Sequence, residues 1–351
     1  MKGLNRFKER LNLYAYNLGM DNSIKKGFLP KKNILFINGI PDDNSLRINM
    51  IHENGNIKWG VSGSANLSYF LKNDFFNRSI TTFDTRGDQE LPRQMIHGVF
   101  NQISDPDTHK ISLQKADDFY KAVSANVPFF NIPSNVMKTT RDNIYQLLQG
   151  IDKLHVPKTV KLQPKSPSDI YEVIKKEDFK FPVIFRQAGD HGGISTIKVD
   201  DEKEQFYAFP LDGRDYYLTQ FVDYKEDGIY AKYRLVVVDG EVLLIHTLFS
   251  ENWMVHGGSQ LKDRKADKLA VSKRFSKEIK PSIQPIVTEI YNRLGLDYFG
   301  IDCHIDNDMN LLAFEINANM NIFIKLENNV FKDFVEIVRN ALIKMLMAEK
   351  D

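Results

Sequence analysis

The stretch GIDCHI at Gly300–Ile305, followed by LLAFEINAN at Leu311–Asn319, decides which fold to expect. Alternate side chains of a strand share one face, so Asp302 faces away from the apolar residues beside it, as do Glu315 and Asn317. If a hairpin brings these polar faces together, two carboxylates and an amide oxygen converge. Mg²⁺ takes such ligands when it also bridges nucleotide phosphates. The alternative is a solvated hairpin face, because two uncompensated carboxylates would be costly to bury without a cation.

A second stretch, FRQAGDHGG at Phe185–Gly193, is a β-like run that ends in a basic residue and continues into a glycine-rich loop. Glycine lets backbone N–H groups approach phosphate oxygens, and an arginine supplies a fixed positive charge. Glycine-rich turns mostly only turn the chain, so this stretch alone leaves both interpretations open. Its candidate nucleotide contacts are Arg186, Gly189, His191, Gly192 and Gly193.

Two cations share one face at the start of a third stretch, YAKYR at Tyr230–Arg234. Lys232 and Arg234 could neutralise a transferring phosphoryl group or an acyl phosphate. The alternative is an exposed edge strand that carries protective charges.

The bulk composition is typical of a globular protein with more than one lobe. The chain has 351 residues, 42% hydrophobic and 26% charged, with a formal net charge of +1, so no global field draws it to nucleic acid or to an anionic membrane. Cys303 is its only cysteine, which excludes an intramolecular disulfide and fits a reducing compartment. No apolar run approaches the roughly 20 residues that span a bilayer. We therefore expect a cytoplasmic protein without nucleic-acid or membrane partners.

The pattern of apolar runs changes along the chain. The first third alternates strand-like and helical segments, which predicts a small α/β domain with a parallel sheet, including a helix near Ser64–Phe75. Beyond a proline-spaced segment near residue 155, the runs predict an antiparallel-rich α+β region, and Asp239-Gly240 marks a hairpin. The expected divisions are residues 1–130, 131–222 and 223–351.

In this order the elements resemble the ATP-grasp superfamily, from about Asn131 to the C-terminal helix, with the preceding α/β region as its usual amino-terminal (pre-ATP-grasp) domain. The most specific match is the hairpin: Glu315 follows Asp302 by 13 residues and Asn317 lies two further on. This spacing resembles the metal triad of the D-alanine ligase and ribosomal-protein glutamyl ligase branches. The resemblance implies an ATP-grasp fold of α/β and α+β parts.

The resemblance also suggests roles for other positions. Arg186 stands where the family usually has a lysine, and Arg234 stands where an arginine contacts phosphate and the acyl intermediate. YLTQFVD at Tyr217–Asp223 resembles the linker that lines the nucleoside. By this match Gln220 and Val222 frame the base and Asp223 faces the ribose. No second phosphate-binding lysine is obvious, and Lys138 or Arg141 are the two substitutes.

A narrower resemblance is to uncharacterised ATP-grasp domains at the carboxyl end of tetratricopeptide proteins. The shared pattern, KYR…H…S..W.VH, consists here of Lys232, Tyr233, Arg234, His246, Ser250, Trp253 and His256. It names no substrate. The stretch SENWMVHGG is either a substrate lid or an ordered surface loop.

The resemblance implies an ATP-dependent carboxylate–amine ligase that forms an acyl phosphate, with ATP and Mg²⁺ as cofactors. Asp302, Glu315 and Asn317 would hold the metal, and Arg234 and Lys232 would stabilise the reacting groups. The substrate is expected to be a small molecule or a peptide, and a homodimer is left open. Two alternatives remain: a small-molecule kinase with His304 or Asp302 as base, and a non-catalytic nucleotide-binding module.

Overall fold

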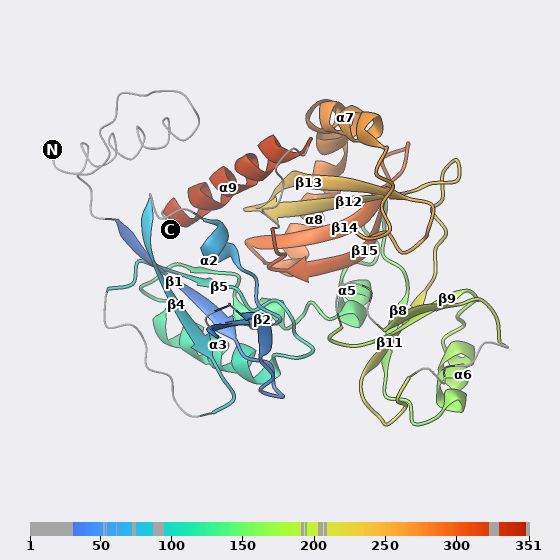
Figure 1. Cartoon of the computed structure of the whole chain (residues 1–351), viewed down its shortest axis with the longest axis horizontal. Coiled ribbons are helices and arrows are strands. Elements are labelled where there is room, and N and C mark those ends of the chain that lie inside the picture. The colour runs from blue at the N-terminus through green and yellow to red at the C-terminus, as the bar shows by residue number, and fades with distance from the viewer. Residues whose placement is uncertain are drawn as a thin grey trace.

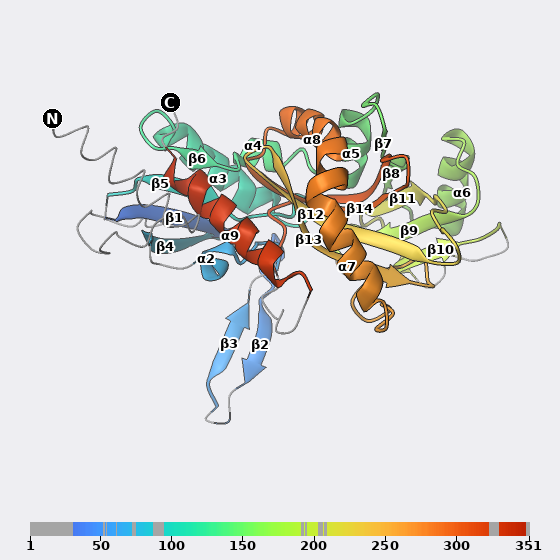
Figure 2. The same ribbon diagram turned by 90° about the horizontal axis from the view of Figure 1, so that it is seen from above.

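The computed structural model describes residues 31–348 except 52, 54, 61, 72–74, 87–94, 191–192, 194, 203–205, 207–208 and 323–329. The described chain is built on three main sheets, from the amino-terminal, central and carboxyl-terminal parts of the sequence, except that the early strand β7 joins the last sheet (Figure 1). A separate ribbon of β2 (Arg47–Ile51) and β3 (Ile57–Gly60) projects from the amino-terminal part (Figure 2). No helix among the described residues is both long and apolar enough to cross a membrane.

The amino-terminal domain holds the predicted parallel sheet. Its order is β4-β1-β5-β6, with β1 at Lys32–Gly39, β4 at Phe76–Phe83, β5 at Gly98–Asn101 and β6 at Phe129–Phe130. Helix α3 (Lys110–Val123) buries Leu113 and Ala116. The helix expected near Ser64–Phe75 is wrong in extent, since α2 covers only Leu67–Phe70. Ser64 is held extended by a bridge to Ile103, so the helix cannot begin there.

The central lobe is a small antiparallel sheet of order β10-β9-β11-β8, as the sequence predicts. Its strands are β8 (Thr159–Leu162), β9 (Val183–Gln187), β10 (Thr196–Val199) and β11 (Tyr216–Gln220). Helix α6 (Pro167–Lys176) begins with a capping box of Ser166 and Asp169 and buries Ile170 and Ile174. The lobe has its own apolar core, in which the rings of Phe185 and Tyr216 stack 4.8 Å apart.

The carboxyl-terminal lobe is a five-stranded sheet of order β13-β12-β14-β15-β7. Its strands are β12 (Tyr230–Val238), β13 (Glu241–Ser250), β14 (Tyr298–Ile305), β15 (Leu311–Ala318) and β7 (Leu154–His155). Asp239 and Gly240 both have positive φ, 50° and 80°, which confirms the predicted hairpin turn. Because β7 pairs with β15, the stretch just before residue 155 contributes to this sheet. The domain boundaries at 130 and 222 stay predictions.

Helices cover both faces of this sheet. Leu235 and Val237 of β12 belong to one apolar core with helix α8 (Lys280–Leu294), whereas Val236 and Val238 belong to another with α9 (Lys332–Met347). Helix α9 thus packs its apolar face against the sheet. Short helices α4 (Pro133–Val136) and α5 (Arg141–Leu147) lead into β7.

One helical stretch was not predicted: α7 (Lys265–Arg274), the π-helical turn η2 (Phe275–Ile279) and α8. Pro281 and Pro285 obscure it in the sequence. Pro281 lies in the first turn of α8, directly after the π-helical turn, and Pro285 lies one turn further, so the helical stretch continues through both.

Candidate functional site

The polar faces of the carboxyl-terminal hairpin do converge, and a β-bulge makes this possible. Arg234 lies directly opposite Asp302, which in turn lies opposite Glu315. The register shifts between Asp302 and Cys303, so that Phe314 is the extra residue on β15. With an unbroken register, Glu315 would instead oppose Ile301 and face the apolar side. The bulge therefore puts both carboxylates on one face.

Asp302 holds the two predicted catalytic cations. Its side chain is 5% exposed and accepts hydrogen bonds from Arg234 Nε at 2.8 Å and Nη2 at 2.7 Å, with Lys232 Nζ at 3.4 Å. Burial alone would raise the pKa of Asp302, but the Arg234 guanidinium lowers it to about 2. Asp302 is therefore ionised at neutral pH and fixes Arg234 in place.

Glu315 is paired with a second arginine. Arg141, the first residue of α5, donates to Glu315 Oε1 and, at 3.3 Å, to the carbonyl of Phe314. Lys138 is exposed and donates to Asn135 instead. Of the two substitutes considered for the missing lysine, Arg141 is the one that reaches the hairpin.

A cleft joins this hairpin to the central lobe. Glu315, Ile316 and Asn317 form one wall, and the other walls come from Arg186, Gly189 and Asp190, from Thr139 and Arg141, and from the amino-terminal loop Ser104–Asp107. The hairpin, the glycine loop and the amino-terminal domain thus meet in one place. The three regions are far apart in the sequence.

Arg186 is an incompletely satisfied cation in this cleft. It donates to the carbonyl of Asp190, but its buried Nε has no hydrogen-bond partner among the described residues. Burial and the nearby Arg141 charge lower its pKa to about 10, so it remains positive at neutral pH. A buried donor without a partner is costly, and an anion in the cleft would satisfy it.

The glycine loop needs its glycines for reasons of space and backbone conformation. Gly189 has φ of +81°, and a Cβ there would lie 2.4 Å from Cγ2 of Thr108. Gly193 also has φ of +81°, and a Cβ there would lie 2.8 Å from Sδ of Met254. His191 and Gly192, two of the predicted nucleotide contacts, lie outside the described residues.

The predicted nucleoside linker forms the end of β11. Gln220 exchanges hydrogen bonds with the backbone of Lys180, donating to its carbonyl at 2.7 Å and accepting from its N–H at 3.0 Å. Asp223 is exposed and accepts from the Tyr230 hydroxyl at 2.9 Å, while Val222 is half-buried. None of these three lines the cleft described above, and their contact with base or ribose stays a prediction.

The loop after β13 covers this linker. The ring of Trp253 packs edge-on against the ring of Phe221, with 5.8 Å between the ring centroids. The backbone carbonyl of Trp253 accepts a hydrogen bond from the Tyr224 hydroxyl at 3.2 Å. His246 lies opposite Arg234, and burial and the Arg234 charge lower its pKa to about 4, so it is neutral at pH 7. His256 is exposed. The loop is thus ordered against the central lobe, and its action as a lid stays a prediction.

The donor set fits Mg²⁺ better than a metal that needs an all-protein cage. In the described part of the chain, no three or more His, Cys, Asp or Glu side chains gather closely enough to hold a metal. Mg²⁺ typically uses one or two carboxylates together with phosphates and water. Glu315 and Asn317 line the cleft, whereas both oxygens of Asp302 are engaged by Arg234. The metal roles of all three residues stay predictions.

Sequence reasoning missed three cleft residues, Ser104, Asp105 and Asp107, and two residues that contact Asp107, Lys161 and Tyr217. The signal for the first three was present: SDPD lies in the loop after a buried parallel strand, and the carboxyl ends of such strands commonly carry functional loops. Lys161 and Tyr217 gave no comparable signal.

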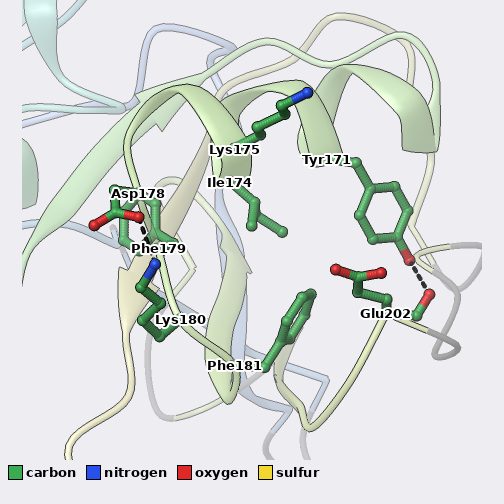
Figure 3. Close-up of a pocket in the computed structure, with 8 residues that line it drawn as sticks. All are labelled: Tyr171, Ile174, Lys175, Asp178, Phe179, Lys180, Phe181 and Glu202. Carbon is green, nitrogen blue, oxygen red and sulfur yellow. Dashed lines mark hydrogen bonds and ion pairs between the residues drawn. The ribbon is translucent and has the colours of Figure 1, made fainter.

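A wider hollow lies elsewhere on the central lobe, between α6 and the segment 178–181 (Figure 3). Its floor is apolar, formed by side chains such as Ile174 and Phe181, and Lys175, Lys180, Asp178 and Glu202 stand around it. It contains none of the predicted site residues. The chemistry is therefore not expected there.

Comparison with known proteins agrees with this fold. Residues 143–337 match the family model described as a RimK-like ATP-grasp domain. No curated protein is similar enough in sequence to count as a match.

Solved structures share the fold at low sequence identity. The VanG D-Ala:D-Ser ligase from Enterococcus faecalis has a TM-score of 0.53 and 11% identity over 91% of this chain and 99% of its own. The D-alanine–D-alanine ligase from Bacillus anthracis, complexed with ATP, has a TM-score of 0.51 and 11% identity over 91% and 96%. The ATP-grasp ligase PsnB, complexed with a minimal precursor, has a TM-score of 0.50 and 16% identity over 90% and 100%.

Proposed function

Because the chain belongs to the RimK-like ATP-grasp family, we propose that it is a ligase that uses the cleavage of ATP to ADP and phosphate to join a carboxylate to an amine. In this reaction the substrate carboxylate oxygen attacks the γ-phosphorus of ATP and ADP leaves. The amine nitrogen then attacks the carbonyl carbon of the acyl phosphate, and inorganic phosphate and a proton are released.

The observation that carries the proposal is the composition of the cleft. Arg186 and Arg141 provide two cations, and Nε of Arg186 has no hydrogen-bond partner among the described residues. Beside them, Glu315 and Asn317 provide oxygen ligands. Polyphosphate together with Mg²⁺ is the ligand that needs both features at once. A carboxylate or a phosphate alone would not need the oxygen ligands.

The residues divide the work by position. Arg186 and the glycine loop would contact the phosphates, and Glu315 and Asn317, with Asp302 beside them, would hold Mg²⁺. When bound, the metal neutralises charge on the phosphates. Arg234 and Lys232, held by Asp302, would stabilise the negative charge that develops on the transferring phosphoryl group and on the acyl phosphate.

An amino acid or a peptide is our proposed substrate class. The fold neighbours support it in general terms, because their names describe ligases of D-alanine and D-serine and a ligase bound to a precursor. The two alternatives make different predictions. A kinase would transfer phosphate to a hydroxyl, and a binding module would hold nucleotide without turnover.

The test is a screen of N-acetylated amino acids and N-acetylated short peptides with Mg-ATP, in which ADP and inorganic phosphate are measured separately with and without an added amine. A ligase releases phosphate in proportion to product, and only when both carboxylate and amine are present. ADP without free phosphate would indicate a kinase. Nucleotide binding without ADP formation under any pair would contradict the proposed activity.

A further inference from the structure

We propose that Asp107 is a positioning residue: it acts as a latch that holds the central lobe against the amino-terminal domain and thereby places Arg186 and Gly189, at the start of the glycine loop, beside Glu315. The inference rests on the proposed function, because losing the contact at Asp107 is expected to weaken nucleotide binding. Its structural part can be tested without any turnover.

Asp107 bridges two lobes through buried, charge-assisted hydrogen bonds. It belongs to the loop that follows β5, and its side chain is only 10% exposed. Lys161 Nζ of β8 donates to its Oδ1 at 2.8 Å, and the hydroxyl of Tyr217 in β11 lies 2.8 Å from each carboxylate oxygen. Bonds to an ionised group are stronger and more directional than neutral ones, so this is a well-defined contact.

The two donors to Asp107, Lys161 and Tyr217, belong to a row of neighbouring side chains on the central sheet that ends at Arg186 in the cleft. Tyr217 lies directly opposite Lys161 on one side and directly opposite Arg186 on the other. Side chains opposite one another in a sheet share a face, so the row Lys161, Tyr217 and Arg186 faces one way. Fixing its first two members at Asp107 therefore fixes where the third lies relative to Glu315.

The next residue of the same loop supports the glycine loop. Thr108 lies against Gly189, where a Cβ would come within 2.4 Å of its Cγ2. Thr108 is itself held by a 2.7 Å hydrogen bond to Asp105. Two adjacent residues of the amino-terminal domain thus position both the arginine strand and the start of the glycine loop.

A matched control exists within the same network. Lys161 also forms an ion pair with Asp215 at 2.9 Å, and Asp215 lies in the central lobe immediately before β11. Asp215→Asn removes a carboxylate from Lys161 while leaving the bonds to Asp107 in place. Asp107→Asn removes the carboxylate on the other side of the lobe boundary. Asp215 also lies 4.0 Å from Lys110 Nζ of α3 across that boundary, but the Lys110 side chain is 63% exposed, so this ion pair contributes little. The two variants therefore differ in whether the buried hydrogen bonds across the boundary are weakened.

The experiment measures the distance between the lobes with spin labels. Asp118→Cys in α3 and Asp178→Cys in the central lobe provide label sites with side chains 64% and 83% exposed. The native Cys303 is buried and should not be labelled. We expect one narrow distance distribution in the labelled parent and in the Asp215→Asn variant. Asp107→Asn should broaden it toward longer distances, and so should Tyr217→Phe, which keeps the ring.

Affinity for a non-hydrolysable ATP analogue provides the second readout. Asp107→Asn and Tyr217→Phe should each raise its Kd about tenfold, and the two effects should not multiply in the double variant, because the bond between Tyr217 and Asp107 is weakened or lost in both. Unchanged distances in Asp107→Asn and Tyr217→Phe, or equal broadening in Asp215→Asn, would overturn the latch. Normal distances in the parent with no analogue binding would instead refute the proposed function and leave the latch standing.

Discussion

Replacing Asp302 by asparagine should destabilise the protein by about 2–3 kcal/mol at pH 7. The folded protein lowers the pKa of Asp302 from the ordinary 3.8 to about 2, and a shift of that size corresponds to roughly 2–3 kcal/mol of stabilisation of the ionised form. Asparagine keeps the shape and one acceptor but leaves Arg234 and Lys232 without a counter-charge in a buried site. Removing one partner of a buried pair typically costs ~3–5 kcal/mol, which bounds the loss from above.

The effect should depend on pH in a defined direction. Because the folded pKa lies below the unfolded one, the stabilisation is fully present above pH ~4 and disappears as the pH falls toward 2. Urea unfolding of the parent and the variant, followed by circular dichroism between pH 7 and pH 3, measures the difference. Asp308→Asn, an exposed position in the turn of the same hairpin, is the control and should change little. Equal stability of parent and Asp302→Asn at pH 7, or a difference that grows below pH 4, would refute the reasoning.

Three further predictions concern the candidate site. Glu315→Gln should abolish Mg-ATP turnover with an unchanged circular dichroism spectrum, and a near-normal rate would contradict its metal role. Arg234→Ala should lower kcat by orders of magnitude and change ATP affinity less, whereas weakened binding at normal kcat would make Arg234 a ground-state contact. Gly189→Ala should weaken ATP-analogue binding, because the φ of +81° at Gly189 and its contact with Thr108 exclude a Cβ. In the parent, the analogue should protect the peptide 186–194 from hydrogen exchange, and the variant should lose this protection. Equal protection in parent and variant would count against the loop assignment.

The elements of the fold could be predicted from local patterns. Alternation of polar and apolar residues identified β12, β14 and β15, and the Asp239-Gly240 pair identified the hairpin between β12 and β13, because both depend on residues adjacent in sequence. Helix α8 was missed for the same reason. Local reasoning treats Pro281 and Pro285 as breaks, and only the helical context shows that one lies in the first turn and the other one turn later.

Patterns along the chain identify the chemical groups of the site: the carboxylates of Asp302 and Glu315, the cation at Arg186 and the glycine loop. How these groups come together depends on the packing of the sheets. Strand register depends on a bulge at Phe314, which no local propensity specifies, and without it Glu315 would face the core. Asp107 reaches Lys161 and Tyr217 only because separate lobes pack together. Such contacts between residues distant in sequence depend on the arrangement of whole sheets, so a pattern read along the chain cannot reveal them.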